Sequence, residues 1–164
     1  MAVAEISETR QYLTFKLMDE VFAVDVEKVR EILEFTSITK VPQTPEYMRG
    51  VINLRGSVVP VMDMRLKFGL PESEKTVNTC IIVVEVSYED GIVIIGALAD
   101  SVQEVFELEP EQIEPPPHIG AKISPNIILG MGKSDGQFIM ILDIDKIFNC
   151  DELNLTEEMI MDAA

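Results

Sequence analysis

The stretch VPQTPEYMRGVINLRGSVVPVMDMRLKFGL, residues 41–70, contains the signals that decide the fold. Its centre has the pattern of a β-strand that is closed by a glycine. Successive side chains of a strand point to opposite faces, so Ile52 and Leu54 are predicted to face the core. Asn53 and Arg55 then face the other way, and this polar pair needs a different explanation.

The same stretch is a basic island in an acidic chain, whose formal charge is −16. It contributes four basic residues against two acidic ones, a net +2: Arg49, Arg55, Arg65 and Lys67 against Glu46 and Asp63. A largely acidic surface repels phosphate backbones, so nucleic acid is not an expected partner. Protein surfaces with basic or apolar patches are the favoured partners.

Length and composition predict a globular protein. With 164 residues, of which 47% are hydrophobic, the chain can form one domain or two small modules that share a core. No apolar run approaches the ~20 residues of a membrane helix, and the N-terminus lacks a signal-peptide pattern. The two cysteines, Cys80 and Cys150, form neither a disulfide framework nor a metal-ligand spacing, so we expect a reduced, cytoplasmic protein.

Short strands and helices of one or two turns are predicted along the chain. Apolar alternation predicts a hairpin over residues 12–26, and residues 80–84 are apolar as in a strand covered on both faces. The strand 51–55 is expected to turn at Gly56-Ser57. Further strands are expected at 58–62, 92–98, 102–108, 127–131 and 138–142, and short helices at 44–50, 63–68 and 143–148. Strands this short favour an all-β fold of the barrel class.

The sequence repeats itself with an offset of 80 residues. The aligned landmarks are Thr44-Pro45 with Ser124-Pro125, Gly50 with Gly130, Gly56 with Gly136, Asp63 with Asp143 and Phe68 with Phe148. A weaker offset of 73 aligns Val29, Glu31 and Ile32 with Val102, Glu104 and Val105. Because these matches are caps, turns and core strands, we interpret the chain as two related small barrels. Asn53 and Arg55 are not repeated, which leaves them free for function.

No set of residues predicts catalysis, a cofactor or a metal. His118, the only histidine, follows three prolines in an expected loop and has no assignable partner. The sequence has no Gly-rich phosphate loop, no Gly-x-Ser-x-Gly and no metal-ligand cluster. We therefore expect a protein that is not an enzyme and has no catalytic, cofactor-binding or metal-binding residues.

Two interpretations of the polar pair stay open. Arg55 offers a planar fork for carboxylates or carbonyl oxygens of a partner, and Asn53 can both donate and accept hydrogen bonds. Alternatively, Arg55 forms a salt bridge within the chain and Asn53 bonds a neighbouring loop. The sequence does not decide between binding and structure.

The segment RGVINLRGSVVPVMDMRLKFG, residues 49–69, closely resembles the signature of CheW-type chemotaxis coupling proteins. The resemblance extends from Tyr12 to Phe148 and includes YLTFKLMDEVFAVDVEKVREI, VPQTPEYMRG and IMILDIDKIF. It implies two intertwined five-stranded β-barrels, with one domain over residues 11–150 whose halves, 11–70 and 79–150, exchange strands. Residues 1–10 and 151–164 are then expected to be flexible tails.

The resemblance also implies a non-enzymatic adaptor that is monomeric when free. Its expected partners are the regulatory domain of a CheA-type histidine kinase and the cytoplasmic tip of methyl-accepting chemoreceptors. The adaptor would be cytoplasmic and recruited to membrane receptor arrays through protein contacts. The alternative is a barrel that binds a small ligand or an oligosaccharide, although the shortage of aromatic residues speaks against sugar stacking.

By resemblance, eleven positions are expected to form the interface with receptor or kinase. In the first half they are Val29, Glu31, Arg49, Gly50, Asn53, Arg55 and Gly56. In the second half they are Thr79, Cys80, Val102 and Val105. The two glycines have an equally direct structural explanation, because they fit a cap and a turn.

Overall fold

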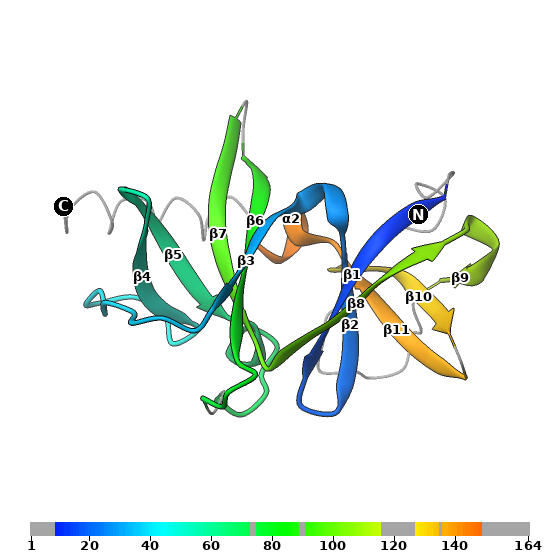
Figure 1. Cartoon of the computed structure of the whole chain (residues 1–164), viewed down its shortest axis with the longest axis horizontal. Coiled ribbons are helices and arrows are strands. Elements are labelled where there is room, and N and C mark those ends of the chain that lie inside the picture. The colour runs from blue at the N-terminus through cyan, green and yellow to red at the C-terminus, as the bar shows by residue number, and fades with distance from the viewer. Residues whose placement is uncertain (1–8, 73–74, 89–90, 116–126, 135, 149–164) are drawn as a thin grey trace.

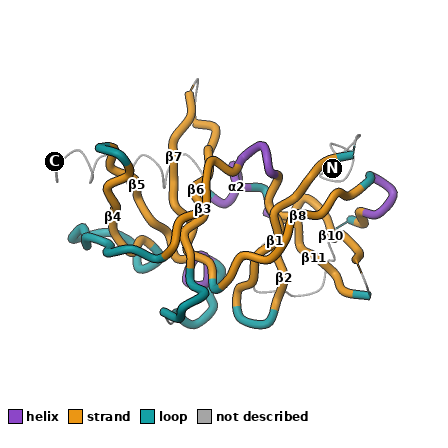
Figure 2. The backbone as a smooth tube through the Cα atoms, in the orientation of Figure 1, coloured by secondary structure: helices purple, strands orange, loops and turns teal. Residues whose placement is uncertain are grey.

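The computed structural model describes residues 9–72, 75–88, 91–115, 127–134 and 136–148. Strands form most of this part of the chain, and the helices are short (Figure 2). The predicted tails, His118 and the three-proline segment beyond Pro115 lie outside the described residues. The prediction of a mainly β fold is confirmed.

The strands form two sheets that lie side by side (Figure 1). The five-stranded sheet has the order β3 (Val29–Glu34), β6 (Cys80–Tyr88), β7 (Gly91–Ala99), β5 (Ser57–Asp63) and β4 (Met48–Leu54). The six-stranded sheet has the order β8 (Ser101–Leu108), β1 (Arg10–Leu17), β2 (Glu20–Asp25), β11 (Gln137–Leu142), β10 (Ile128–Ser134) and β9 (Ile113–Glu114). The helices are η2 (Val26–Lys28), α1 (Met64–Lys67), η3 (Pro110–Gln112) and α2 (Ile144–Ile147).

The expectation of two closed five-stranded barrels needs correction. One sheet has six strands, and neither strand order closes on itself within the described residues. At the β4 edge the physical reason is visible, because Thr39 already occupies it. Thr39 N donates to Val51 O at 2.9 Å, and Val51 N donates to Thr39 O at 2.8 Å. Those backbone groups of β4 are therefore not available to β3.

Each sheet combines strands from distant parts of the sequence. β11 pairs in parallel with β2, with Ile141 opposite Ala23, and β5 pairs in parallel with β7, with Val61 opposite Gly96. These two registers are related by the same offsets, 80 and 73, that the sequence repeat shows. The two parallel pairings are therefore equivalent positions of the two repeats.

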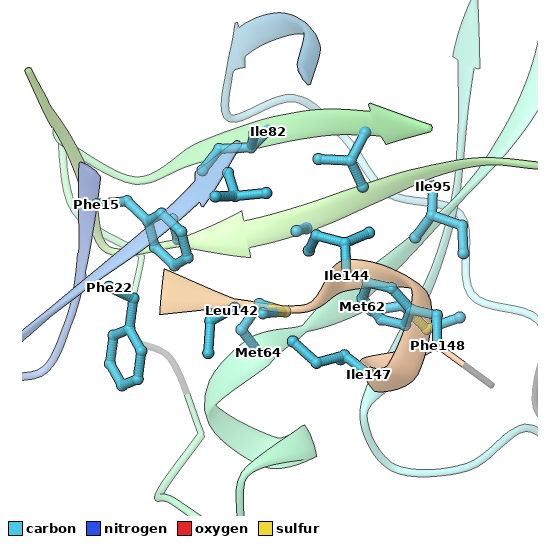
Figure 3. Close-up of a cluster of buried hydrophobic side chains, with 14 of the residues drawn as sticks. Phe15, Phe22, Met62, Met64, Ile82, Ile95, Leu142, Ile144, Ile147 and Phe148 are labelled. Atoms are coloured by element: carbon cyan, nitrogen blue, oxygen red, sulfur yellow. The ribbon is translucent and has the colours of Figure 1, made fainter. Parts of the chain in front are cut away.

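Three apolar clusters hold the sheets. The largest cluster is shared by both sheets, and Figure 3 shows Ile144, Ile147 and Phe148 of the α2 region beside Met62. Each sheet also encloses a smaller cluster of its own. The apolar run in β6 serves two clusters at once: Ile81 and Val83 join the five-stranded sheet's own cluster, and Ile82 and Val84 join the shared one. This confirms the prediction of a strand covered on both faces.

The repeat is also present in the local geometry. Asp63 caps α1 by accepting from the backbone N of the residue two positions on, and Asp143 caps α2 in the same way. Gly56 and Gly136 both occupy hairpin turns with positive φ, 89° and 78°. Asp63 N donates to Tyr47 O and Asp143 N to Ile127 O, again 80 residues apart. The repeat therefore describes structure, as the sequence predicted.

One predicted helix is wrong. Residues 44–47 form turns that lead into β4 and not a helical turn. The Thr44 hydroxyl does not cap a helix, because it donates backward to Val41 O at 3.0 Å. Gly50 is not a helix stop but a residue inside β4 with φ 142°, next to a shift in the β4–β5 register.

Gly50→Ala is expected to lower the free energy of unfolding by about 1–3 kcal/mol, as overpacked sites do. A Cβ at this position would lie 2.1 Å from the backbone oxygen of Thr39, and backbone cannot move aside as a flexible side chain can. Gly69→Ala is the control, because its φ is also positive but nothing lies within 4 Å of a Cβ there. Urea denaturation of both variants measures the difference, and equal losses would contradict the close-contact explanation.

Candidate partner-binding surface

Arg55 and Gly56 form the two-residue turn of the β4–β5 hairpin. Leu54 pairs with Ser57, and both turn residues have positive φ, 51° for Arg55 and 89° for Gly56. Two positive φ values in a two-residue loop are the geometry of a type I′ turn, which matches the twist of the flanking strands. The turn predicted at Gly56-Ser57 is therefore wrong by one residue, and Arg55 belongs to the turn rather than to the strand.

Asn53 holds this turn together. Its Oδ1 accepts a hydrogen bond from Gly56 N at 2.7 Å, which is the local bond expected of an Asn beside a turn. Its strand partner Val58, which we expected to pack inside as part of an apolar strand, is about half exposed. Asn53 and Arg55 do not project side by side from one strand, as the alternation predicted, because Arg55 leaves the strand with a left-handed backbone. Ile52 and Leu54 do pack into the cluster of the five-stranded sheet.

Arg55 makes a two-pronged ion pair with Glu31 of β3. The two guanidinium nitrogens of Arg55 lie 2.6 and 2.8 Å from the two carboxylate oxygens of Glu31. β3 and β4 are the opposite edges of the five-stranded sheet, so the sheet curls until a side chain can bridge its edges. The Arg55 side chain is 73% exposed and that of Glu31 is 23% exposed. The salt bridge within the chain therefore exists, but it stands open to solvent and to a partner.

The pair shifts the titration of both groups. The hydrogen bond from Arg55 lowers the pKa of Glu31 below its ordinary value of 4.5, and the same bond raises the pKa of Arg55. A lowered carboxyl pKa means that the pair favours the folded state above the unfolded pKa of Glu31. That contribution is lost as the pH falls through the lower folded pKa.

The other basic side chains of the 41–70 stretch are engaged within the chain. Arg49 lies 3.7 Å from the buried carboxylate of Asp63 and also contacts Glu72. Arg65 pairs with Asp100, and the Lys67 ammonium lies 4.5 Å from the centre of the Tyr47 ring. Arg49 and Gly50 therefore shape the hairpin from inside the scaffold, and Arg55 is the most accessible of the three arginines by its exposed side chain.

The second group of predicted positions lies where the chain passes between the sheets. Thr79 is buried, and its hydroxyl accepts from Thr76 N at 2.8 Å. The Cys80 thiol is half-buried, burial raises its pKa, and the backbone of Val102 hydrogen-bonds it. Val105, on the edge strand β8, is 51% exposed. The structure thus brings Cys80 and Val102 together and leaves Val105 on the surface.

Two exposed apolar side chains beside the first group were not among the predicted positions. Ile32 follows Glu31 on β3, and Val58 lies opposite Asn53, and both are about half exposed. Val29, which was predicted, packs instead against the shared core. An apolar residue at an outward position of an edge strand is the signal that would have identified Ile32.

The comparison with known proteins now identifies the family. The sequence model of the CheW-like domain matches residues 11–152. The chain belongs to the CheW-like domain family. It is 31% identical to the chemotaxis protein CheW of Klebsiella aerogenes over 92% of this chain and 88% of that protein. It is 33% identical to the chemotaxis protein CheW of Helicobacter pylori over 88% of this chain and 84% of that protein.

A solved structure supports the same conclusion. The scaffolding protein TtCheW of Thermoanaerobacter tengcongensis superposes with a TM-score of 0.77 at 33% identity, over 87% of this chain and 90% of that chain. This CheW-like chain is therefore a non-enzymatic adaptor of chemotaxis signalling, as the sequence predicted. The alternative of a barrel that binds a small ligand or an oligosaccharide finds no support in these comparisons.

Two further searches of the CheW-like chain cover only its described part. Across those ranges, no helix has the length and apolar character needed to span a membrane. The same residues contain no group of three or more His, Cys, Asp or Glu side chains that could hold a metal ion.

Arg55→Gln should raise the pKa of Glu31 toward its ordinary value, because the hydrogen bond that lowers this pKa is lost. NMR titration of the Glu31 side-chain carbon in the wild type and the variant measures the change. Arg30→Gln is the matched control, because Arg30 is only a minor influence on the pKa of Glu31. Equal Glu31 titration in the wild type and Arg55→Gln would show that the ion pair does not form in solution.

Proposed function

We propose that this chain couples methyl-accepting chemoreceptors to a CheA-type histidine kinase, with one CheW-like domain over about residues 11–150 as the coupling unit. Membership of the CheW-like family and its chemotaxis relatives supports this assignment. The observation that carries the site is the exposed Arg55–Glu31 pair at a rigid hairpin turn. The protein works in the cytoplasm as a monomer that protein contacts recruit to membrane receptor arrays.

The first proposed contact surface is the open edge of the five-stranded sheet. It presents Glu31 and Arg55, with Asn53 and the exposed apolar side chains of Ile32 and Val58 nearby in the strand pairing. Charged groups beside exposed apolar area are the usual composition of a transient protein interface. Gly50, Gly56, Arg49 and Val29 support this surface from below through the turn, the Thr39 contact and the core.

The second proposed contact surface lies around β8. Val105 is the accessible member, and Val102, Cys80 and Thr79 hold the chain beneath it. An apolar residue on an edge strand offers both a side chain and unpaired backbone groups to a partner. Two surfaces on one rigid domain are what a scaffold needs in order to hold two partners at once.

Arg55→Asp should weaken the capture of a receptor-tip fragment strongly and change the melting temperature little, since surface substitutions rarely unfold a protein. Lys133→Asp is the control, because it makes the same charge change at a side chain that is 60% exposed on the other sheet. A pull-down series and thermal denaturation measure the two effects. Equal capture by both variants, or unfolding of Arg55→Asp, would refute the proposed contact.

The charge-swapped pair Glu31→Arg with Arg55→Glu separates two ways in which the ion pair can act. If the partner contacts Arg55 itself, the swapped pair should remain defective although the salt bridge is restored. If the pair only holds the edges of the sheet, capture should recover. Recovery would therefore contradict a direct contact with Arg55.

Val105→Glu should weaken the binding of one partner, kinase or receptor, while leaving the other partner and the stability nearly unchanged. The reason is that Val105 is already half exposed, so the substitution removes an outward apolar contact and no core packing. Phe138→Glu is the matched control, because Phe138 is an equally exposed apolar residue on the same sheet. Isothermal titration calorimetry with each partner distinguishes a β8 contact from a general effect of added charge.

A further inference from the structure

Two ion pairs join the sheets at equivalent points of the repeat. The first links Arg65 of α1 to Asp100, the residue immediately before β8, with Arg65 Nε 3.0 Å from both carboxylate oxygens. The second links Asp145 of α2 to Lys28, the residue immediately before β3, at 3.0 Å. In both cases a helix residue pairs with the segment that crosses from one sheet to the other.

The helix residues of the two pairs correspond position by position. Arg65 and Asp145 are 80 residues apart, which is the offset of the repeat. Each stands two residues after its helix-capping aspartate, and each donates its backbone N–H to that cap, at 3.0 Å for Asp63 and 3.1 Å for Asp143. α1 and α2 therefore present equivalent side chains to equivalent crossovers.

The aspartate of each pair also holds the hairpin of the neighbouring sheet. Asp100 accepts from Met18 N in the β1–β2 turn at 2.7 Å. Asp145 accepts from Ser87 N in the β6–β7 hairpin at 2.8 Å. These hairpins are equivalent as well, because β2 and β7 make the two matching parallel pairings. Helix, crossover and hairpin thus meet in the same way at both sites.

The sign of the charges is inverted between the two sites. At the first site the helix carries the base, Arg65, and the crossover carries the acid, Asp100. At the second site the helix carries the acid, Asp145, and the crossover carries the base, Lys28. A fold that only needed a salt bridge at each site would not require opposite signs.

We propose that this inversion prevents like-with-like assembly of the two halves. If the first half of one copy joined the first half of another, Arg65 would face Lys28. If two second halves joined, Asp145 would face Asp100. Both contacts place like charges together, whereas the pairing of a first half with a second half satisfies both sites. Misassembly is a typical failure of repeat proteins, and exchanged strands expose this chain to it.

Charge reversal at one site removes the inversion while keeping each native pair. In K28D/D145K, both helices carry a base and both crossovers an acid, so like-with-like contacts become attractive. After dilution from urea at high protein concentration, we expect an oligomer fraction on the order of fivefold above wild type, which corresponds to about 1 kcal/mol. Size-exclusion chromatography with light scattering measures this fraction, and R65D/D100R should behave in the same way.

The quadruple variant that combines both reversals is the decisive control. It restores opposite signs at the two sites, so its oligomer fraction should return to the wild-type level. It nevertheless loses both hairpin acceptors, Asp100 and Asp145, so a purely structural role of the ion pairs predicts that it is the worst of all. An oligomer fraction at or above that of the single-site reversals would overturn the proposal.

A milder variant keeps the proposal testable if the reversals fail to fold. K28Q/D145N removes the charges of the second site and leaves an amide oxygen to accept from Ser87 N. Like-with-like contacts are then neutral rather than repulsive, and the oligomer fraction should rise to a level between wild type and K28D/D145K. An oligomer fraction equal to that of wild type would show that packing alone selects the partner half.

Discussion

The shared apolar core between the sheets is the constraint on which the rest of the structure depends. The two parallel pairings, β2 with β11 and β5 with β7, join distant segments, so each sheet is completed by strands from elsewhere in the chain. Ile82 and Val84 reach this core from one sheet, and Phe15 and Phe22 reach it from the other. Burial of apolar area is the dominant favourable term in folding. The sheets therefore stabilise one another and are not independent barrels.

The repeat explains how much of the fold could be predicted from the sequence. Helix caps, turn glycines and the doubly covered strand β6 depend on neighbours within a few residues, so their chemistry is visible in the sequence. Asp63 and Asp143 illustrate this, because each caps its helix as predicted. The helix expected at 44–50 was wrong because two longer-range facts decided that segment. Thr44 bonds backward to Val41, and Thr39 docks beside Gly50.

The candidate site shows a sharper limit. The resemblance to a known family supplied the identities of the residues, but it did not supply their geometry. Whether Arg49 and Arg65 are accessible depends on Asp63 and Asp100, which are 14 and 35 positions away in the sequence. The bridge from Arg55 to Glu31 joins two sheet edges that no local pattern relates. Only the folded structure separates Arg55, which is exposed, from the other arginines of the same stretch.

The exposed ion pair also determines what a partner can gain from it. Both carboxylate oxygens of Glu31 are already bonded to Arg55 before any partner arrives. A partner that takes Arg55 for itself must replace those two bonds, so the exchange contributes little net affinity. A partner that binds the pair as a unit keeps the bonds and adds its own contacts to the exposed guanidinium. In either case this pair serves recognition and orientation more than binding strength, and apolar neighbours such as Ile32 and Val58 must supply most of the affinity.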